Sequence, residues 1–431
     1  MKMKSLLGLL VAAALAATMA GQPAAAQDEK PIRIGIVTFL SGGAAGPFGI
    51  PARNAAEITV EALNAGTIPT PYHKKGIGSR PIETVIIDEA GGTTKQVTEY
   101  RNLVQRHQVD LVIGYISSGD CLAIAPLADE LKKLTVFFDC GTPRIFEDAK
   151  YTYLFRTGPT ATMDSVGAAL YVLHRNPKVA TVAGINQNYA WGQDSWTDFR
   201  ASMTVLKPEI KVGTEQFPKL YAGAYSSEIS ALQVANADVI HSSFWGGDME
   251  AFVLQGAARG LFANRAVVLT TGETGMFRLG RQMPDGTILG GRGPHGVFAP
   301  DNALNKWFRP LYEQRYQTPP TYPSYKMVVA FLGVKAAYEK AMAGAAGHPT
   351  DEQVIAAFSG LEYDSPSGKV SMVLGEGHQA IQETAYGVFK YDAEKGATIT
   401  EIVRYPAECV NPPNGVKSEE WIKGGFKGAK C

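Results

Sequence analysis

The sequence predicts an α/β protein of two lobes, each a parallel sheet flanked by helices. Short strands that are apolar on both faces alternate with amphipathic helices, which is typical of a parallel sheet covered on both sides. The alternation occurs in two successive runs, with a break near residues 155–159. About 405 residues (431 minus a leader of 26) are enough for two or three domains.

The leader has the order of a secretory signal peptide. Lys2 and Lys4 form a basic start, residues 6–17 are apolar but too short to span a bilayer, and small residues from Ala24 to Ala26 offer a cleavage site. We expect cleavage after Ala26. No Cys follows the apolar run, so a lipid anchor is not expected, and the predicted location is the periplasm.

The first run consists of four strand–helix units. The opening strand is followed by a small-residue loop and by a helix that Gly66 closes. The predicted strands lie at residues 32–37, 84–87, 109–113 and 134–138, and further helices at 93–106 and around 124–131.

The second run has strands near residues 179–185, 238–242 and 266–270, and the pattern loosens after about residue 287. Helices at 307–316, 325–343 and 351–358 follow, and residues 370–374 and 386–391 are expected to form a hairpin. The late chain is expected to return to the first lobe. The predicted division is 28–156 with 292–365 for the N-terminal lobe, 157–291 with 366–395 for the C-terminal lobe, and 396–431 for a tail.

Export makes disulfides possible for the four cysteines. Cys409 and Cys431 bracket a tail rich in Pro and Gly, where a disulfide would restrict a loose terminus, so this pair is predicted to form. Cys121 and Cys140 each follow a predicted strand, so their loops can meet. For these two, a disulfide and buried free thiols both remain open.

Composition and motifs argue against several functions. Lys plus Arg (41) equals Asp plus Glu (41), so no basic field would attract nucleic acid or anionic lipid. The chain has no Gly-x-Ser-x-Gly elbow and no His or Cys spacing typical of a metal site. Residues 291–296 spell a dinucleotide fingerprint, but Pro294 and His295 lie inside it and no clear helix follows, so we interpret it as a crossing between lobes. No cofactor, metal or catalytic residue is predicted.

Loops that follow strands are the candidate site, because ligands of open parallel sheets lie at the carboxyl ends of the strands. First-lobe loops carry hydroxyl groups at the start of a helix, where free N–H groups favour a carboxylate. Second-lobe loops carry aromatic walls and one acid that could hold an ammonium group. The residues are Ser117, Ser118 and Thr142 in the first lobe, and Trp191, Trp245 and Glu273 in the second.

Each of these residues also has a plain structural interpretation. Ser and Thr at helix starts are usually caps, Glu273 could be a solvated turn residue, and the two Trp could pack between lobes. The joint placement at strand ends favours binding.

At these loops the chain resembles the periplasmic leucine/isoleucine/valine-binding proteins, which are type I solute-binding proteins of ABC importers. The resemblance extends from residue 32 to about 391. It rests on Leu40-Ser41-Gly42, Val112-Ile113-Gly114 with Ser117-Ser118, Gly141-Thr142-Pro143, Phe155-Arg156-Thr157, the stretch from Tyr189 to Gln193, and the stretch from Gly272 to Gly275.

The resemblance implies a role for individual residues. Ser118 and Thr142 would bind a ligand carboxylate, and the Cys140 carbonyl and Glu273 would bind an ammonium group. Phe48 would match a first-loop aromatic. Trp191 and Trp245 stand at two positions where the family often has Tyr. Asp120 adds an acid near the residues that would bind the ligand carboxylate. These departures leave an aromatic or amide ligand open beside an amino acid.

The resemblance also implies a function and partners. We expect a monomeric, non-enzymatic protein whose lobes, joined by three crossings, close on a small molecule recognised by an inner-membrane ABC permease. A periplasmic sensor would use the same fold. A hydrolase of small amides is disfavoured, because no nucleophile and base are paired in the sequence.

Overall fold

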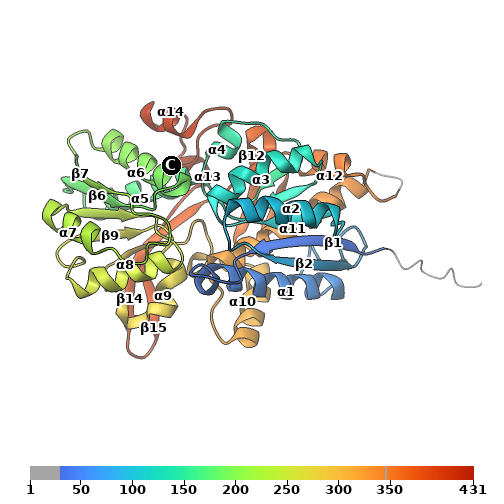
Figure 1. Ribbon diagram of the computed structural model, residues 1–431, viewed down its shortest axis with the longest axis horizontal. Coiled ribbons are helices and arrows are strands. Elements are labelled where there is room, and N and C mark those ends of the chain that lie inside the picture. The colour runs from blue at the N-terminus through green and yellow to red at the C-terminus, as the bar shows by residue number, and fades with distance from the viewer. Residues whose placement is uncertain (1–29, 345–346) are drawn as a thin grey trace, which may run out of the picture.

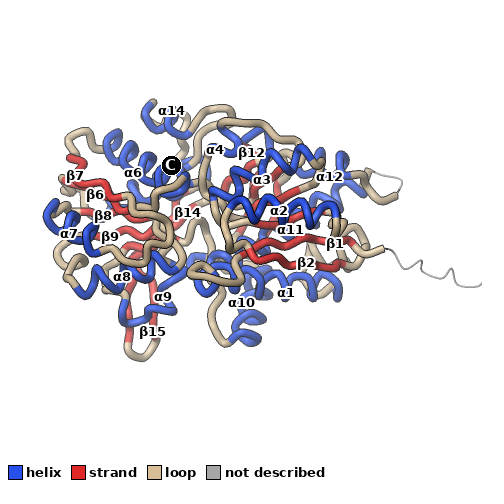
Figure 2. Tube along the Cα trace, viewed as in Figure 1, coloured by secondary structure: helices blue, strands red, loops and turns tan. Residues whose placement is uncertain are grey.

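The computed structural model describes residues 30–344 and 347–431 and has two lobes side by side (Figure 1). The predicted signal peptide, residues 1–26, lies outside the described residues. Each lobe has one sheet, of eight strands in the first lobe and seven in the second, with helices on both sides (Figure 2). This is the predicted fold class.

The first lobe is centred on five parallel strands. Their spatial order is β5-β4-β3-β1-β2, and the chain forms β1 (Ile32–Thr38), β2 (Ile82–Asp88), β3 (Leu111–Gly114), β4 (Thr135–Phe137) and β5 (Leu154–Arg156).

Alternate side chains of these strands bury against different helices. Ile34 and Ile36 belong to the core that also contains α1 (Ile50–Ala65) and α11 (Tyr322–Met342). Val37 and Val112 belong to the opposite core, with α2 (Thr93–Gln105) and α3 (Ser118–Glu130). The sheet is therefore apolar on both faces, as the sequence pattern predicts.

The second lobe repeats this architecture. Its parallel strands are β6 (Thr181–Ile185), β7 (Lys211–Gln216), β8 (Val239–Ser242), β9 (Ala266–Leu269) and β10 (Ile288–Gly290). One side is covered by α5 (Ala161–Arg175) and α6 (Ala190–Leu206), and the other by α7 (Ser226–Ala235), α8 (Gly247–Ala258) and α9 (Glu273–Leu279).

The late chain corrects the predicted hairpin. β12 (Gly368–Leu374) pairs with β11 (Glu362–Ser365) and β13 (Gln379–Ile381) in the first sheet. β14 (Thr384–Asp392) pairs with β10 and β15 (Gly396–Tyr405) in the second. The turn at Gly375 and Gly377, both with positive φ, lets β12 and β13 pair as neighbours.

The predicted division of the chain therefore shifts at its third crossing. The sequence predicts residues 366–381 in the second lobe, but β12 and β13 lie in the first sheet, where Val370 and Met372 join its core. Residues 396–405 were assigned to the tail, but they form the outer strand of the second sheet. The crossings lie at 157–160, after β10, and at 382–383.

The true tail begins after β15 and packs on the second lobe. α13 (Ala407–Val410) and α14 (Ser418–Lys423) bury Val410, Trp421 and Ile422 against Met163 and Val166 of α5. A Cys409–Cys431 disulfide closes it, as predicted, and a second disulfide joins Cys121 to Cys140, the pair for which the sequence left a disulfide and free thiols open.

Two long helices start earlier than predicted. α10 (Ala303–Tyr316) begins after Asn302, whose side chain accepts from the Asn305 N–H, and α11 begins at Tyr322 with Pro323 in its first turn. The remaining elements are short: α4 (Arg144–Glu147), α12 (Asp351–Phe358), η1 (Ala45–Gly49), η2 (Gly280–Gln282), η3 (Gly296–Phe298) and η4 (Gly375–Gly377).

Across residues 30–344 and 347–431, no helix is both long and apolar enough to cross a bilayer. The same part of the chain has no cluster of three His, Cys, Asp or Glu side chains placed to hold a metal ion.

Candidate ligand-binding cleft

A narrow cavity lies between the lobes, where the loops after the strands of both sheets meet. The first lobe contributes Phe48, Ile116, Ser118, Asp139, Gly141 and Tyr322, the second Tyr189, Trp191, Trp245 and Thr271, and the crossing after β10 contributes Arg292. The closed cavity is therefore built by both lobes together.

Five of the eleven lining residues are aromatic. Phe48 meets Trp245 edge-on at 5.2 Å and Tyr322 edge-on at 5.3 Å between ring centres. The indole of Trp245 donates to the Tyr189 hydroxyl at 2.6 Å, and that of Trp191 donates to the Ser243 carbonyl at 2.8 Å. Because the polar edges of both indoles are satisfied inside the protein, the parts of the rings that line the cavity offer apolar surface to a ligand.

A buried group of four charges lies beneath this wall. Arg292 Nε donates to Asp164 at 2.9 Å, a second guanidinium nitrogen bonds Asp139, and Lys326 Nζ donates to the same Asp139 oxygen at 2.8 Å. All four side chains are at most 4% exposed. Burial lowers the pKa of Lys326 to about 7, and repulsion from Arg292 adds to this. The guanidinium also stacks over Trp191, 4.3 Å from its ring centre.

Asp139 offers one open acceptor at the cavity. One of its oxygens bonds both cations, while Oδ2 is buried and has no hydrogen-bond partner among the described residues. Buried polar atoms are usually paired, so this oxygen is suited to a donor on a ligand or a bound water.

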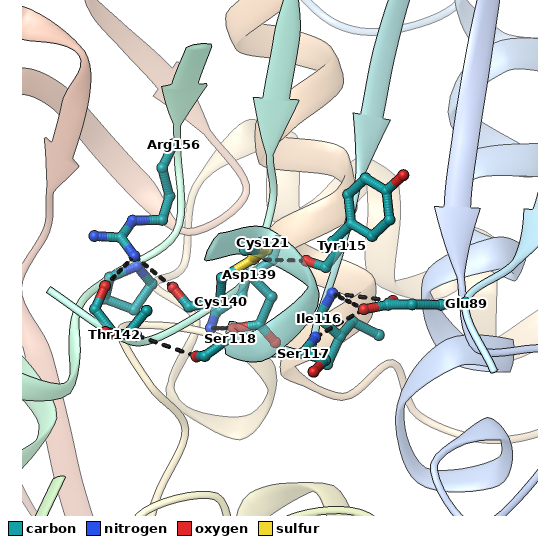
Figure 3. The surroundings of a disulfide bond; sticks show 12 residues. Glu89, Tyr115, Ile116, Ser117, Ser118, Cys121, Asp139, Cys140, Thr142 and Arg156 are labelled. Atoms are coloured by element: carbon teal, nitrogen blue, oxygen red, sulfur yellow. Dashed lines mark hydrogen bonds and ion pairs between the residues drawn. A yellow bond between two sulfur atoms is a disulfide. The ribbon is translucent and has the colours of Figure 1, made fainter. Parts of the chain in front are cut away.

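Glu89 occupies the place predicted for a ligand carboxylate. The Ile116 and Ser117 N–H groups each donate to its Oε1 at 2.8 Å (Figure 3). Glu89 is fully buried, and burial, with the neighbouring Asp120, raises the pKa of its carboxyl well above the usual value. The Ser117 N–H is therefore bound to a carboxyl group of the protein itself, and Ser117 does not line the cavity.

Of the predicted first-lobe ligands, only Phe48 and Ser118 line the cavity. The Ser118 hydroxyl oxygen accepts from the Thr142 N–H at 3.2 Å and keeps its own proton free to donate (Figure 3). Thr142 Oγ1 instead donates to Asp194 of α6 at 2.6 Å, which makes it a contact between lobes. The Cys140 carbonyl accepts from Arg156 at 2.7 Å and so is not free for an ammonium group.

In the second lobe, Trp191 and Trp245 line the cavity as predicted, but Glu273 does not. Its carboxyl group accepts from the Tyr322 N–H at 2.9 Å and from the Val297 N–H at 3.4 Å. Tyr322 is the first residue of α11, whose free N–H groups favour an acid. Gly296 is required beside it, because a Cβ there would lie 1.8 Å from Glu273 Oε1. Glu273 thus ties the second lobe to a first-lobe helix.

Glu273→Gln is expected to flatten the dependence of stability on pH between about 5 and 8. Burial raises the pKa of Glu273 to about 8, against an ordinary value of 4.5. The folded protein therefore retains a proton that the unfolded chain releases above 4.5, and stability contributed by this group is lost as the pH rises toward 8. Between pH 5 and 8, the free energy of unfolding of the wild type should fall by up to about 1.4 kcal/mol per pH unit more than that of the variant.

Urea unfolding at pH 5, 6, 7 and 8 measures this difference. The control is Glu250→Gln, since Glu250 pairs at the surface with Arg278. Parallel stability curves for the wild type and Glu273→Gln would contradict the protonated state of Glu273.

Sequence reasoning missed the polar centre of the cleft. Arg292 lies inside the Gly-rich crossing at 291–296, and a lone Arg among glycines was the available signal. Asp139 lies two residues after the end of β4, at a strand end of the kind where the sequence predicts site residues. Tyr322 gave no signal, because it reaches the cleft from a first-lobe helix that starts after a Pro-rich turn.

Comparisons with known proteins agree with this architecture. A family model described as periplasmic binding protein matches residues 31–396. No curated protein matches the chain. Solved structures align over most of the chain at identities that show the fold alone.

One is a solute-binding protein of an ABC transporter from R. palustris in complex with benzoate: 19% identity, TM-score 0.75, covering 90% of this chain and 100% of that one. Another solute-binding protein from R. palustris is in complex with 4-hydroxybenzoate. It is 21% identical, has a TM-score of 0.74, and the alignment covers 88% of this chain and 98% of that one. A leucine-binding protein from Thermotoga maritima also aligns, with 17% identity and a TM-score of 0.72, over 86% of this chain and 98% of that one.

Proposed function

The chain belongs to the periplasmic binding protein family, and on that premise we propose that it captures a small carboxylate with a planar apolar body and delivers it to an ABC permease. After loss of residues 1–26 it would act in the periplasm as a monomer. The permease would recognise the closed arrangement of the two lobes, which the ligand must favour over the open one.

The cavity wall carries this proposal. Two indoles and three further rings surround a space that reaches Arg292, whose guanidinium lies on a Trp face and bonds two acids and the Pro159 carbonyl, one through each nitrogen. A carboxylate is recognised well by such a charge-assisted donor, and a flat body fills the gap between rings. The Ser118 hydroxyl supplies a second donor. Benzoate-type ligands of the R. palustris proteins have this chemistry.

An amino acid is the second candidate ligand, because Asp139 Oδ2 is an open acceptor at the same cavity. An ammonium group there would lie beside a carboxylate that already bonds two cations. The predicted ammonium partners Glu273 and Cys140 are engaged elsewhere, which favours the ligand without an amine.

Titration calorimetry on protein refolded from denaturant, which removes any ligand acquired in the cell, tests the proposal. Benzoate, 4-hydroxybenzoate, leucine and phenylalanine are the probes. We expect the benzoates to bind at least about tenfold more tightly than leucine, the size of one charge-assisted hydrogen bond. Bound probe should be recovered chemically unchanged. Tight binding of leucine with none of benzoate would reject the aromatic acid, and binding of none of the four would reject both ligand classes.

A further inference from the structure

Arg156 is a buried cation that makes no hydrogen bond to an acid in the part of the chain that the structure describes. It ends β5, is 0% exposed, and donates through Nη1 to the carbonyls of Cys140 and Thr142 at 2.7 and 2.6 Å. Its Nε bonds the side-chain oxygen of Gln379. All three acceptors are uncharged, and no ion pair in the described chain includes Arg156. Nη2 has no partner there, and Figure 3 shows it pointing away from the two carbonyls.

Arg156 is one of the residues that line a cavity of about 380 Å³, larger than the cleft cavity. This cavity lies between the first lobe, around α4 and η4, and tail residues 412–418. Its apolar wall includes Phe146, Tyr151, Leu374 and Val416. The Phe146 ring centre is 5.7 Å from Arg156 Cζ. The cavity therefore places an apolar surface next to a free cationic donor.

The other cations at this cavity already have partners. Lys150 pairs with Glu376, and Lys417 pairs with Asp148 at 2.7 Å. Glu147 accepts from the Ser418 N–H at 3.1 Å and from its hydroxyl. Burial lowers the pKa of Arg156 to about 9, with repulsion from Arg292 as the second cause, so an anion at Nη2 would relieve a destabilised charge.

We propose that this cavity is a second ligand site, which takes a small monocarboxylate with an apolar body. One carboxylate oxygen accepts from Arg156 Nη2, and the body lies against Phe146 and Val416. Glu147 in the same wall disfavours multiply charged anions such as phosphate. The apolar lining favours an organic acid over an inorganic ion.

The site connects the tail to the first lobe. The tail is anchored on the second lobe by α13 and α14 and is closed on itself by its disulfide, whereas Phe146 and Arg156 belong to the first lobe. A ligand held between them contacts parts that move relative to each other if the lobes open, so its binding is expected to be linked to closure. This inference does not depend on which solute the cleft takes.

Crystals soaked with 4-bromobenzoate test the site, because the anomalous signal of bromine locates the probe. We expect a bromine peak in the cavity, with the carboxylate within hydrogen-bond distance of Arg156 Nη2, whether or not a second peak lies in the cleft. Only water beside Arg156 would overturn the proposal. The same result would say nothing against the cleft, so the two proposals fail separately.

Calorimetry tests binding in solution. Val416→Trp fills the cavity from a tail position that is 39% exposed, so the fold should tolerate it. It should remove one binding event for 4-bromobenzoate or weaken it at least roughly tenfold. Val373→Trp, at a 38% exposed position outside the cavity, is the matched control and should leave binding unchanged. Equal binding of 4-bromobenzoate by the wild type and Val416→Trp would overturn the proposal. A bromine peak in the cavity would then mean binding at crystal concentration only.

Discussion

Arg292→Gln is expected to lower the free energy of unfolding by about 3–5 kcal/mol, because it breaks a buried ion network from one side. Asp164 would lose its cationic partner, and Asp139 would keep only Lys326. Burial already raises the pKa of Asp164, so removing the neighbouring charge makes its ionised form more costly still. The same change removes the cation that lines the cleft.

Chemical denaturation at pH 7 measures the loss, with Arg278→Gln as control. Arg278 also bonds an acid, Glu250, but its side chain is 51% exposed, so its removal should cost no more than about 1 kcal/mol. Equal stabilities of the two variants would show that the Arg292 network contributes nothing beyond a surface pair.

Gly141→Ala is expected to weaken ligand binding roughly 5- to 150-fold while leaving the unfolding of the ligand-free protein nearly unchanged. A Cβ at this position would lie 2.0 Å from the Trp191 ring and 2.7 Å from an Arg292 nitrogen. Gly141 belongs to the first lobe and Trp191 to the second, so the collision acts mainly when the lobes close. Overpacking of this kind costs about 1–3 kcal/mol, which gives the stated range.

The measurement is the affinity for whichever benzoate binds the wild type, together with urea unfolding without ligand. Gly213→Ala in β7 is the control, since its Cβ would meet nothing closer than 3.4 Å. Unchanged affinity in Gly141→Ala would mean that the closed contact between Gly141 and Trp191 is not part of the bound state.

The fold was predictable because hydrophobic periodicity and strand–helix alternation are local properties of the chain. Strands such as β1 and β3 are apolar on both faces, which identifies a covered parallel sheet without any knowledge of contacts. Pairing between strands is not local. The expected hairpin failed for that reason, because β12 and β14 are consecutive in pattern yet pair in different sheets.

The sequence predicted the location of the site, at the carboxyl ends of the strands, but not its detailed contacts. Placement after a strand correctly brought Phe48, Ser118, Trp191 and Trp245 to one cavity. It gave no information on which atoms face that cavity, since partners distant in sequence compete for the same groups. Glu89 takes the N–H of Ser117, 28 residues away, and the N–H of Tyr322 takes Glu273, 49 residues away.

Asp194 bonds Thr142 and Arg144 across the lobes, and Lys417 and Ser418 bond the first lobe from the tail. These four attachments need no solute. A protein that has such bonds when its lobes are closed requires less binding free energy from the solute to remain closed, so a solute of few atoms can suffice. The same bonds resist release, and a transporter that opens this protein must break them before the cargo can leave.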